Sequence, residues 1–194
     1  KGAQVDDLHL LRYRETIDPK SPTITLLSPA GTVGATFAEQ GFIPASGVSA
    51  KLPTPETVWT APPGATLTES TPLVLTWDNG EGLVFTRTIS IGDDYLFSVT
   101  QSVENRGAQP VSLFPFARVI RQDTPVVAGY WVFFEGMLGV ADGALQEVHY
   151  SDASETTEPV RVDSTGGRLA STDKHWAAVT IPDQTRAVST TCAQ

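Results

Sequence analysis

Histidines and carboxylates are the side chains of this sequence that could do acid–base or metal chemistry, and their spacing limits both. The three histidines are His9, His149 and His175. A metal site needs ligands about two residues apart on a strand or about four apart on a helix, and no two histidines are so spaced. Glu147 lies two residues before His149, so the two share a strand face and could act as an acid–base couple. A solvated strand pair is the commoner explanation of that spacing.

The other acidic clusters favour structural roles. Asp93-Asp94 lies between two predicted strands, where an aspartate side chain caps the turn backbone. Asp6-Asp7 precedes an apolar run and can accept backbone N–H bonds there. Glu135 ends the aromatic stretch YWVFFEG and could be buried and paired, or could line a groove. Asp173-Lys174 could form a local ion pair, which contributes little if it is exposed.

Motifs for covalent, nucleotide and metal chemistry are missing from the sequence. It contains no GxSxG, no GxGxxG and no GxxxxGK[ST]. Cys192 is the single cysteine, so neither an internal disulfide nor a CxxC metal site is possible. Four tryptophans could stack on a sugar ring but are more often core residues of a sandwich: Trp59, Trp77, Trp131 and Trp176. We therefore predict no catalytic residue, no cofactor and no metal, and leave any groove or interaction residues unassigned.

The middle of the chain predicts the strands that would position such side chains. Asn79-Gly80 is a strong hairpin signal, because a type I′ turn needs positive φ at both central residues. Residues 83–91 place apolar side chains on one face, with Arg87 the exception, and residues 95–103 alternate in the same way. The pattern predicts a four-stranded antiparallel meander over residues 71–121.

The rest of the chain continues this pattern more loosely. The Ser28-Pro29 pair ends one predicted strand, because a residue before proline avoids the helical region, and ATFAEQGF (residues 35–42) could form one helical turn. Strands are predicted at residues 5–13, 23–27, 57–59, 111–121, 129–135, 145–150, 159–163 and 175–181. Roughly twelve or more short strands with turns between them predict an all-β fold, a large sandwich forming one domain over residues 1–194.

Composition and charge argue against several classes of partner. Of 194 residues 40% are hydrophobic, and 22 acidic against 13 basic residues give a net charge of −9. An acidic chain without a Lys/Arg cluster is a poor match for nucleic acid and for anionic lipid headgroups. No run of 18 or more apolar residues predicts a membrane span. Lys1 does not open a signal peptide, so we expect a cytosolic protein or a piece of a longer one.

Five sequence blocks together carry a family resemblance. They are residues 2–32, 37–42 (FAEQGF), 71–105, 133–150 (FFEGMLGVADGALQEVHY) and 165–182 (TGGRLASTDKHWAAVTIP). In this order, and over nearly the whole chain, they resemble the large periplasmic domain of the YidC family of bacterial membrane protein insertases.

This resemblance implies a β-supersandwich, the fold shared with galactose mutarotases and their carbohydrate-binding relatives. It implies a domain in the periplasm, outside the bilayer, attached to a protein of the bacterial inner membrane. It also implies an accessory interaction module whose partners are SecDF, the Sec translocon and nascent membrane proteins. The insertase step of the family belongs to membrane helices, so no insertase residue maps onto this chain.

Two departures from the family pattern bear on possible ligand positions. Phe134 stands where many members have a histidine before Glu-Gly. Where many members read GGW-GITDKYW, this chain has Arg168, Ala170, Ser171 and His175. We interpret these positions as structural rather than catalytic.

Two other functions remain open at this point. A carbohydrate-binding or mutarotase-like protein is the alternative, because the implied fold and the tryptophans suit it. A domain that mainly spaces or shields the membrane core is a second. The sequence alone does not separate them.

Overall fold

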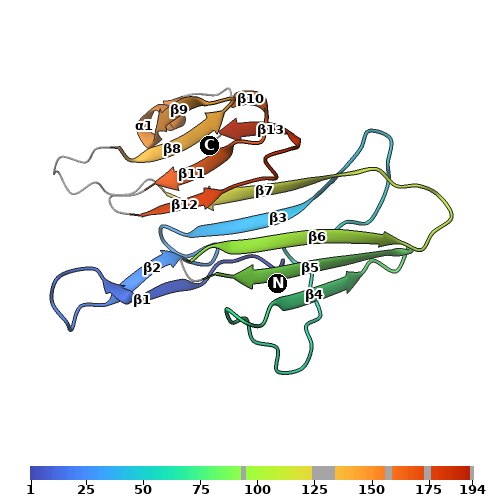
Figure 1. The fold of residues 1–194 in the computed structure, drawn as a ribbon, viewed down its shortest axis with the longest axis horizontal. Coiled ribbons are helices and arrows are strands. Elements are labelled where there is room, and N and C mark those ends of the chain that lie inside the picture. The colour runs from blue at the N-terminus through green and yellow to red at the C-terminus, as the bar shows by residue number, and fades with distance from the viewer. Residues whose placement is uncertain (93–94, 124–133, 156–158, 173–175, 193–194) are drawn as a thin grey trace. The chain divides into compact units, whose positions relative to one another are not determined.

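The protein is all-β in the part of the chain that the structure describes, as the sequence predicts. The computed structural model describes residues 1–92, 95–123, 134–155, 159–172 and 176–192. Its strands are β1 (Leu8–Arg14), β2 (Thr23–Leu27), β3 (Thr36–Pro44), β4 (Leu73–Asp78), β5 (Leu83–Ile91), β6 (Phe97–Asn105), β7 (Leu113–Arg121), β8 (Gly136–Ala141), β9 (Ala144–His149), β10 (Val160–Thr165), β11 (Arg168–Thr172), β12 (Ala177–Thr180) and β13 (Ala187–Cys192) (Figure 1). The one helix in these residues, α1 (Tyr150–Glu155), is too short to cross a membrane.

The chain divides into two compact units. The first comprises Lys1–Gln4 and Glu39–Phe116, and the second comprises Val5–Ala38 and Ala117–Gln194. The first unit contains the antiparallel sheet β4-β5-β6. The second contains the sheets β1-β2, β10-β13 and β12-β11-β8-β9. Strands β3 and β7 pair with each other, and each contributes residues to both units.

Strand β5 shows the predicted alternation most clearly. Leu83, Phe85, Arg87 and Ile89 are buried, and the residues between them are half-buried. The ring of Phe85 lies 5.5 Å from that of Trp77 and 5.6 Å from that of Phe42, measured between centroids. Burial of these side chains contributes about 25 cal/mol for each Å² of apolar surface. The inward face of β5 is thus the core of the first unit.

The hairpin between β4 and β5 exists, but its predicted type I′ turn is wrong. Positive φ falls on Gly80 and Gly82, at +75° and +94°, and not on Asn79. The buried Asn79 side chain instead accepts bonds from the backbone N–H groups of Glu81 (2.7 Å) and Leu83 (3.0 Å). This local side-chain capping stabilises a four-residue connection in place of the two-residue turn.

The predicted fourth strand of the meander is present but pairs elsewhere. Strand β7 pairs with β3 and not with β6. Seven residues separate β6 from β7, and one of them, Pro110, has no N–H to offer a ladder. Ala45, just after β3, donates its N–H to the carbonyl of Ser112, just before β7, at 3.1 Å. The loop therefore carries the chain to β3 instead of back along β6.

Other predictions divide between confirmed, wrong and outside the described residues. Strands β1, β2, β9, β10 and β12 confirm predicted ones within a few residues. The helical turn expected in ATFAEQGF is wrong, because Thr36–Pro44 is a strand whose pairing overrides local propensity. Residues 57–59 form no strand, and only Thr60 bridges to Thr76. Most of the strand predicted at 129–135 lies outside the described residues, and β3, β8, β11 and β13 were not predicted.

Candidate functional site

A buried arginine organises the polar centre of the first unit. Alternation along β5 directs Arg87 inward, where it is 1% exposed. One terminal nitrogen, Nη1, donates to the carbonyls of Ala3 (2.7 Å) and Gly2 (3.3 Å). The other, Nη2, donates to the Gln40 carbonyl (2.6 Å) and to Oε1 of Gln101 (3.0 Å). The guanidinium therefore links the N-terminal residues, β3 and β6 to β5.

The electrostatics of Arg87 fit a structural role. Burial lowers the pKa of Arg87, and the negative charge of Glu39 opposes that effect. The guanidinium lies 5.0 Å from the ring centroid of Trp59, within cation–π range. Its hydrogen-bond acceptors are neutral oxygens of the protein, which occupy both terminal nitrogens of the guanidinium, whereas its Nε is buried with no hydrogen-bond partner in the described residues.

The N-terminal residues fill the space beside this arginine. Gly2 donates its N–H to the Thr57 carbonyl at 2.8 Å. It has a φ of +67°, and a Cβ there would lie 2.8 Å from the carbonyl oxygen of Pro55. Both constraints require glycine. Lys1 and Glu56 form an exposed ion pair of 2.9 Å, which contributes little.

A cavity of about 320 Å³ lies where β5 begins and β6 ends. Its lining includes Asn79, Glu81 and Asn105. The two asparagine amides already donate to backbone carbonyls: Asn79 to that of Lys51 (3.1 Å), in another loop, and Asn105 to that of Gln109 (2.7 Å), in its own loop. The lining also contains apolar residues such as Leu83 and Val111, and its two asparagine side chains are already held by the protein's own hydrogen bonds.

In the second unit, His9 forms a contact that the sequence analysis missed. Its Nε2 lies 2.9 Å from Oδ1 of Asp7, and its Nδ1 lies 3.1 Å from the hydroxyl of Thr25. Thr25 is the partner of His9 in the β1-β2 ladder. The two-residue spacing used for Glu147 and His149 would also have found Asp7 and His9.

The order carboxylate–imidazole–hydroxyl resembles a catalytic triad in connectivity alone. The side chains of His9 and Asp7 are 47% and 69% exposed. Acyl transfer needs a desolvated site with donors aimed at the developing oxyanion. Water screens this exposed set, so we interpret it as a cross-strand contact that stabilises β1 against β2.

The predicted couple of Glu147 and His149 has no acid–base geometry. Both residues are exposed on β9, and in the described part of the chain no hydrogen bond or ion pair joins them. The His149 ring packs instead on Phe134, with centroids 4.8 Å apart. Phe134 thus contacts a histidine from the strand that pairs with β8.

A network of hydroxyl groups holds the start of β8 against β11. The Thr172 hydroxyl donates to the Gly136 carbonyl (3.0 Å) and accepts from its N–H (3.1 Å). The Tyr150 hydroxyl lies 2.8 Å from that of Ser171 and donates to the Thr172 carbonyl (2.7 Å). Glu135 is half-buried, and its Oε2 is buried with no hydrogen-bond partner in the described residues.

The three tryptophans in the described part of the chain are all half-buried. Trp77 packs on the buried Phe85, and Trp59 packs on Arg87. Trp176 meets Tyr13 edge to face, with centroids 5.1 Å apart. Several predicted candidates lie outside the described residues: Asp93-Asp94, Trp131, Asp173-Lys174 and His175.

Comparison with known proteins identifies the family. A family model described as "YidC periplasmic domain" matches residues 1–194. The chain belongs to the YidC periplasmic domain family. It is 50% identical over 183 residues to the membrane protein insertase YidC of Bradyrhizobium diazoefficiens, covering 94% of this chain and 29% of that protein.

Two further relatives agree with this assignment. The membrane protein insertase YidC of Nitrobacter hamburgensis is 47% identical over 184 residues, which cover 94% of this chain and 30% of that protein. The membrane protein insertase YidC of a Methylobacterium species is 48% identical over 194 residues, which cover 95% of this chain and 30% of that protein. The chain thus spans less than a third of the length of these relatives. The resemblance seen in the sequence is confirmed, and the family places the chain in the periplasm; the likeness to galactose mutarotases stays a prediction.

Proposed function

We propose that this chain is an accessory interaction domain of a membrane protein insertase and catalyses no reaction of its own. The observation that carries the proposal is the family match over residues 1–194, in a chain that corresponds to 29–31% of its relatives. We assign insertion itself to parts of the full-length protein that lie outside this match.

The geometry of the described polar groups supports a non-enzymatic role. Arg87 is occupied by backbone carbonyls, His9 by its strand neighbours, and His149 by a phenylalanine ring. A catalytic group must instead meet its substrate at hydrogen-bond distance in a preorganised site. These contacts stabilise sheets, which suits a rigid scaffold.

The location and partners follow from the same proposal. The full-length protein acts in the bacterial inner membrane, where it aids the insertion, folding and assembly of membrane proteins with or without the Sec translocon. This domain contacts SecDF and the translocon from the periplasm. The two compact units act together as one domain over residues 1–194, a proposal supported by the single family match across both.

Crosslinking in membranes tests this function. A photoreactive residue is placed in the full-length protein at exposed positions of each unit, such as Thr100 on β6 and Val179 on β12, with the buried Phe85 as the matched silent position. We expect adducts with Sec components from exposed positions of one face. A domain-deleted protein that fully complements a depleted strain, together with no adducts at any position, would show a spacer instead.

A carbohydrate-binding function is the second candidate, and the Tyr13–Trp176 pair is the observation that favours it. Tyr13 is 46% exposed, and aromatic faces of this kind can stack on sugar rings. Calorimetric titration of the chain with aldohexoses, and an assay of anomer exchange, distinguish the two. Heat that disappears in Tyr13→Ala, or accelerated anomer exchange, would replace the proposal above.

A further inference from the structure

The β1-β2 hairpin contains an irregularity in its ladder that places apolar and basic side chains at the surface. The register passes from Leu10 opposite Ile24 directly to Arg14 opposite Thr23. Strand β1 therefore carries three additional residues, Leu11, Arg12 and Tyr13, where β2 carries none. Bulges of this kind redirect side chains and are common at functional positions.

All ten residues from Leu11 to Lys20, here called the hairpin tip, are exposed. Leu10, the residue before the tip, is 2% exposed, whereas Leu11 is 77% and Ile17 is 104% exposed. The core contribution of this strand thus ends at Leu10. Leu11, Tyr13 and Ile17 are all exposed on this one hairpin, and exposed apolar side chains that gather in one place can mark an interaction site.

The charges of the tip differ from those of the whole chain. The hairpin has three basic residues, Arg12, Arg14 and Lys20, against Glu15 and Asp18, so its net charge is +1 in a chain of net −9. In the described part of the chain no hydrogen bond or ion pair involves the Arg12 or Lys20 side chain. Arg14 donates to the Ser21 carbonyl at 2.6 Å, and Asp18 accepts from the Lys20 N–H at 2.8 Å.

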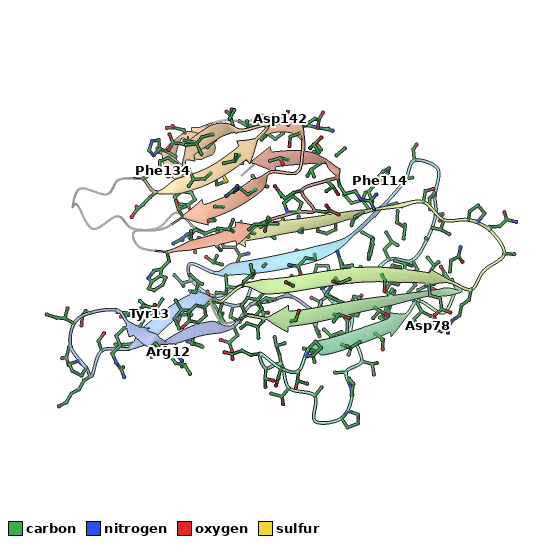
Figure 2. All side chains as sticks on the ribbon, in the orientation of Figure 1. Arg12, Tyr13, Asp78, Phe114, Phe134 and Asp142 are labelled. Atoms are coloured by element: carbon green, nitrogen blue, oxygen red, sulfur yellow. The ribbon has the colours of Figure 1, made fainter. Side chains whose placement is uncertain are left out.

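We propose that the hairpin tip is a peripheral membrane-contact site that binds the headgroup region of a bilayer containing anionic lipid. Ile17 and Leu11 enter the interface, Arg12 and Lys20 reach the lipid phosphates, and the Tyr13–Trp176 pair lies at headgroup level. Figure 2 shows the side chains of Arg12 and Tyr13 on β1. This set of residues is that of interfacial anchors: aliphatic side chains for the acyl boundary, Trp and Tyr for the headgroups, and cations for the surface charge.

The net charge of −9 does not prevent this contact. Ionic screening at physiological salt acts over about 8 Å, so carboxylates elsewhere in the chain contribute little at the tip. The average composition argues against an anionic lipid surface, but the bilayer meets the local charge. The proposal goes beyond the accessory function above, because it assigns a lipid partner and a named surface.

Residue-resolved NMR of the whole chain with lipid bicelles tests the proposal. Bicelles of phosphatidylcholine mixed with phosphatidylglycerol carry a trace of lipid with a paramagnetic headgroup. We expect relaxation enhancement of the backbone amides of the tip and none at the exposed residues Ser98, Thr100, Ser102 and Glu104 of β6. Bicelles of phosphatidylcholine alone should give a weaker effect at the same residues.

Matched variants separate the apolar and charged contributions. Ile17→Ser should weaken bicelle binding about tenfold, because it removes an aliphatic side chain that becomes buried when the tip enters the bilayer interface. Val33→Ser, at a position that is 98% exposed in the same unit but outside the tip, should leave binding unchanged. The double variant Arg12→Glu, Lys20→Glu should remove the dependence on anionic lipid. All of these positions are exposed, so the variants should retain the unfolding midpoint of the parent chain.

Three results would overturn the proposal. The first is enhancement spread evenly over the chain or centred outside the tip. The second is an equal effect of Ile17→Ser and Val33→Ser. The third is a tip that is silent on both bicelles while a photoreactive residue at Thr16 of the full-length protein crosslinks to a protein, which would assign the surface to a protein partner instead.

Discussion

Arg87 on β5 is buried, whereas Arg12 on β1 is exposed. Strand β5 keeps an unbroken antiparallel register, with six residue pairs to β4 and nine to β6. An unbroken ladder fixes which side chains share a face, so Arg87 is forced inward with Phe85. The register of β1 is interrupted just before Arg12, which is exposed. Continuity of the ladder, more than residue type, decides which arginine is buried.

The largest expected effect comes from removing the buried arginine. Arg87→Ala should lower the free energy of unfolding by about 3–5 kcal/mol, because buried carbonyl oxygens lose the donors that satisfied them. Arg12→Ala should change it by less than about 0.5 kcal/mol, as an exposed substitution does. Urea unfolding of the two variants, followed by circular dichroism, measures both values.

Arg87→Lys serves as the control for charge alone. Lysine keeps the positive charge but lacks the planar fork that reaches Ala3 on one side and Gln40 on the other. Its effect should therefore be intermediate. If Arg87→Ala and Arg12→Ala lowered the free energy of unfolding equally, the burial of Arg87 would make no difference to its contribution to stability.

The alternation along β5 and β6 could be predicted from the sequence because local pattern and tertiary pairing agree there. Arg87 broke the apolar pattern, and a charged residue on a core face signals a buried network whose partners the sequence cannot name. Three of the four acceptors, the carbonyls of Gly2, Ala3 and Gln40, are backbone atoms far away in sequence, and only the fourth, Oε1 of Gln101, belongs to a side chain. Sequence patterns describe side chains, so contacts made by backbone atoms leave no pattern to find.

The errors of sequence-based prediction have related causes. ATFAEQGF has the local composition of a helical turn, but pairing with β7 makes it a strand. The three additional residues of β1 lie within the run LHLLRYR, whose alternation of apolar and polar residues fails after Leu10. An interrupted alternation in a predicted strand is thus a usable signal for a bulge, and it would have drawn attention to the hairpin tip.

Two asparagines extend the comparison of buried and exposed sites to turns. Asn79 and Asn105 both accept from a backbone N–H two residues later and donate to a carbonyl, but Asn79 is 3% exposed and Asn105 is exposed. Asn79→Ala should cost about 2–3 kcal/mol of stability, because the buried N–H of Leu83 loses its acceptor. Asn105→Ala should cost about 0.5–1 kcal/mol, since water replaces the lost bonds.

Urea unfolding midpoints of the two asparagine variants measure this difference. Asn79→Asp is the matched control, because a carboxylate keeps the acceptor for both N–H groups but loses the donor to the Lys51 carbonyl. It should fall between the parent chain and Asn79→Ala. A loss in Asn105→Ala as large as in Asn79→Ala would mean that burial does not set the cost of a turn side chain.

The smallest expected effect concerns the reactivity of Cys192, which lies on a strand with a regular ladder but without deep burial. Strand β13 keeps six unbroken pairs with β10, yet its residues alternate between exposed and half-buried. Partial burial raises the pKa of the Cys192 thiol, because desolvation disfavours the thiolate. Alkylation by iodoacetamide, which requires the thiolate, should therefore reach half its maximal rate at a higher pH in the folded chain than in the same chain unfolded in urea. The pH midpoint, unlike the maximal rate, is insensitive to steric access. If the folded and the unfolded chain give the same pH midpoint, then the regular β10-β13 ladder leaves the Cys192 thiol as hydrated as it is in the unfolded chain.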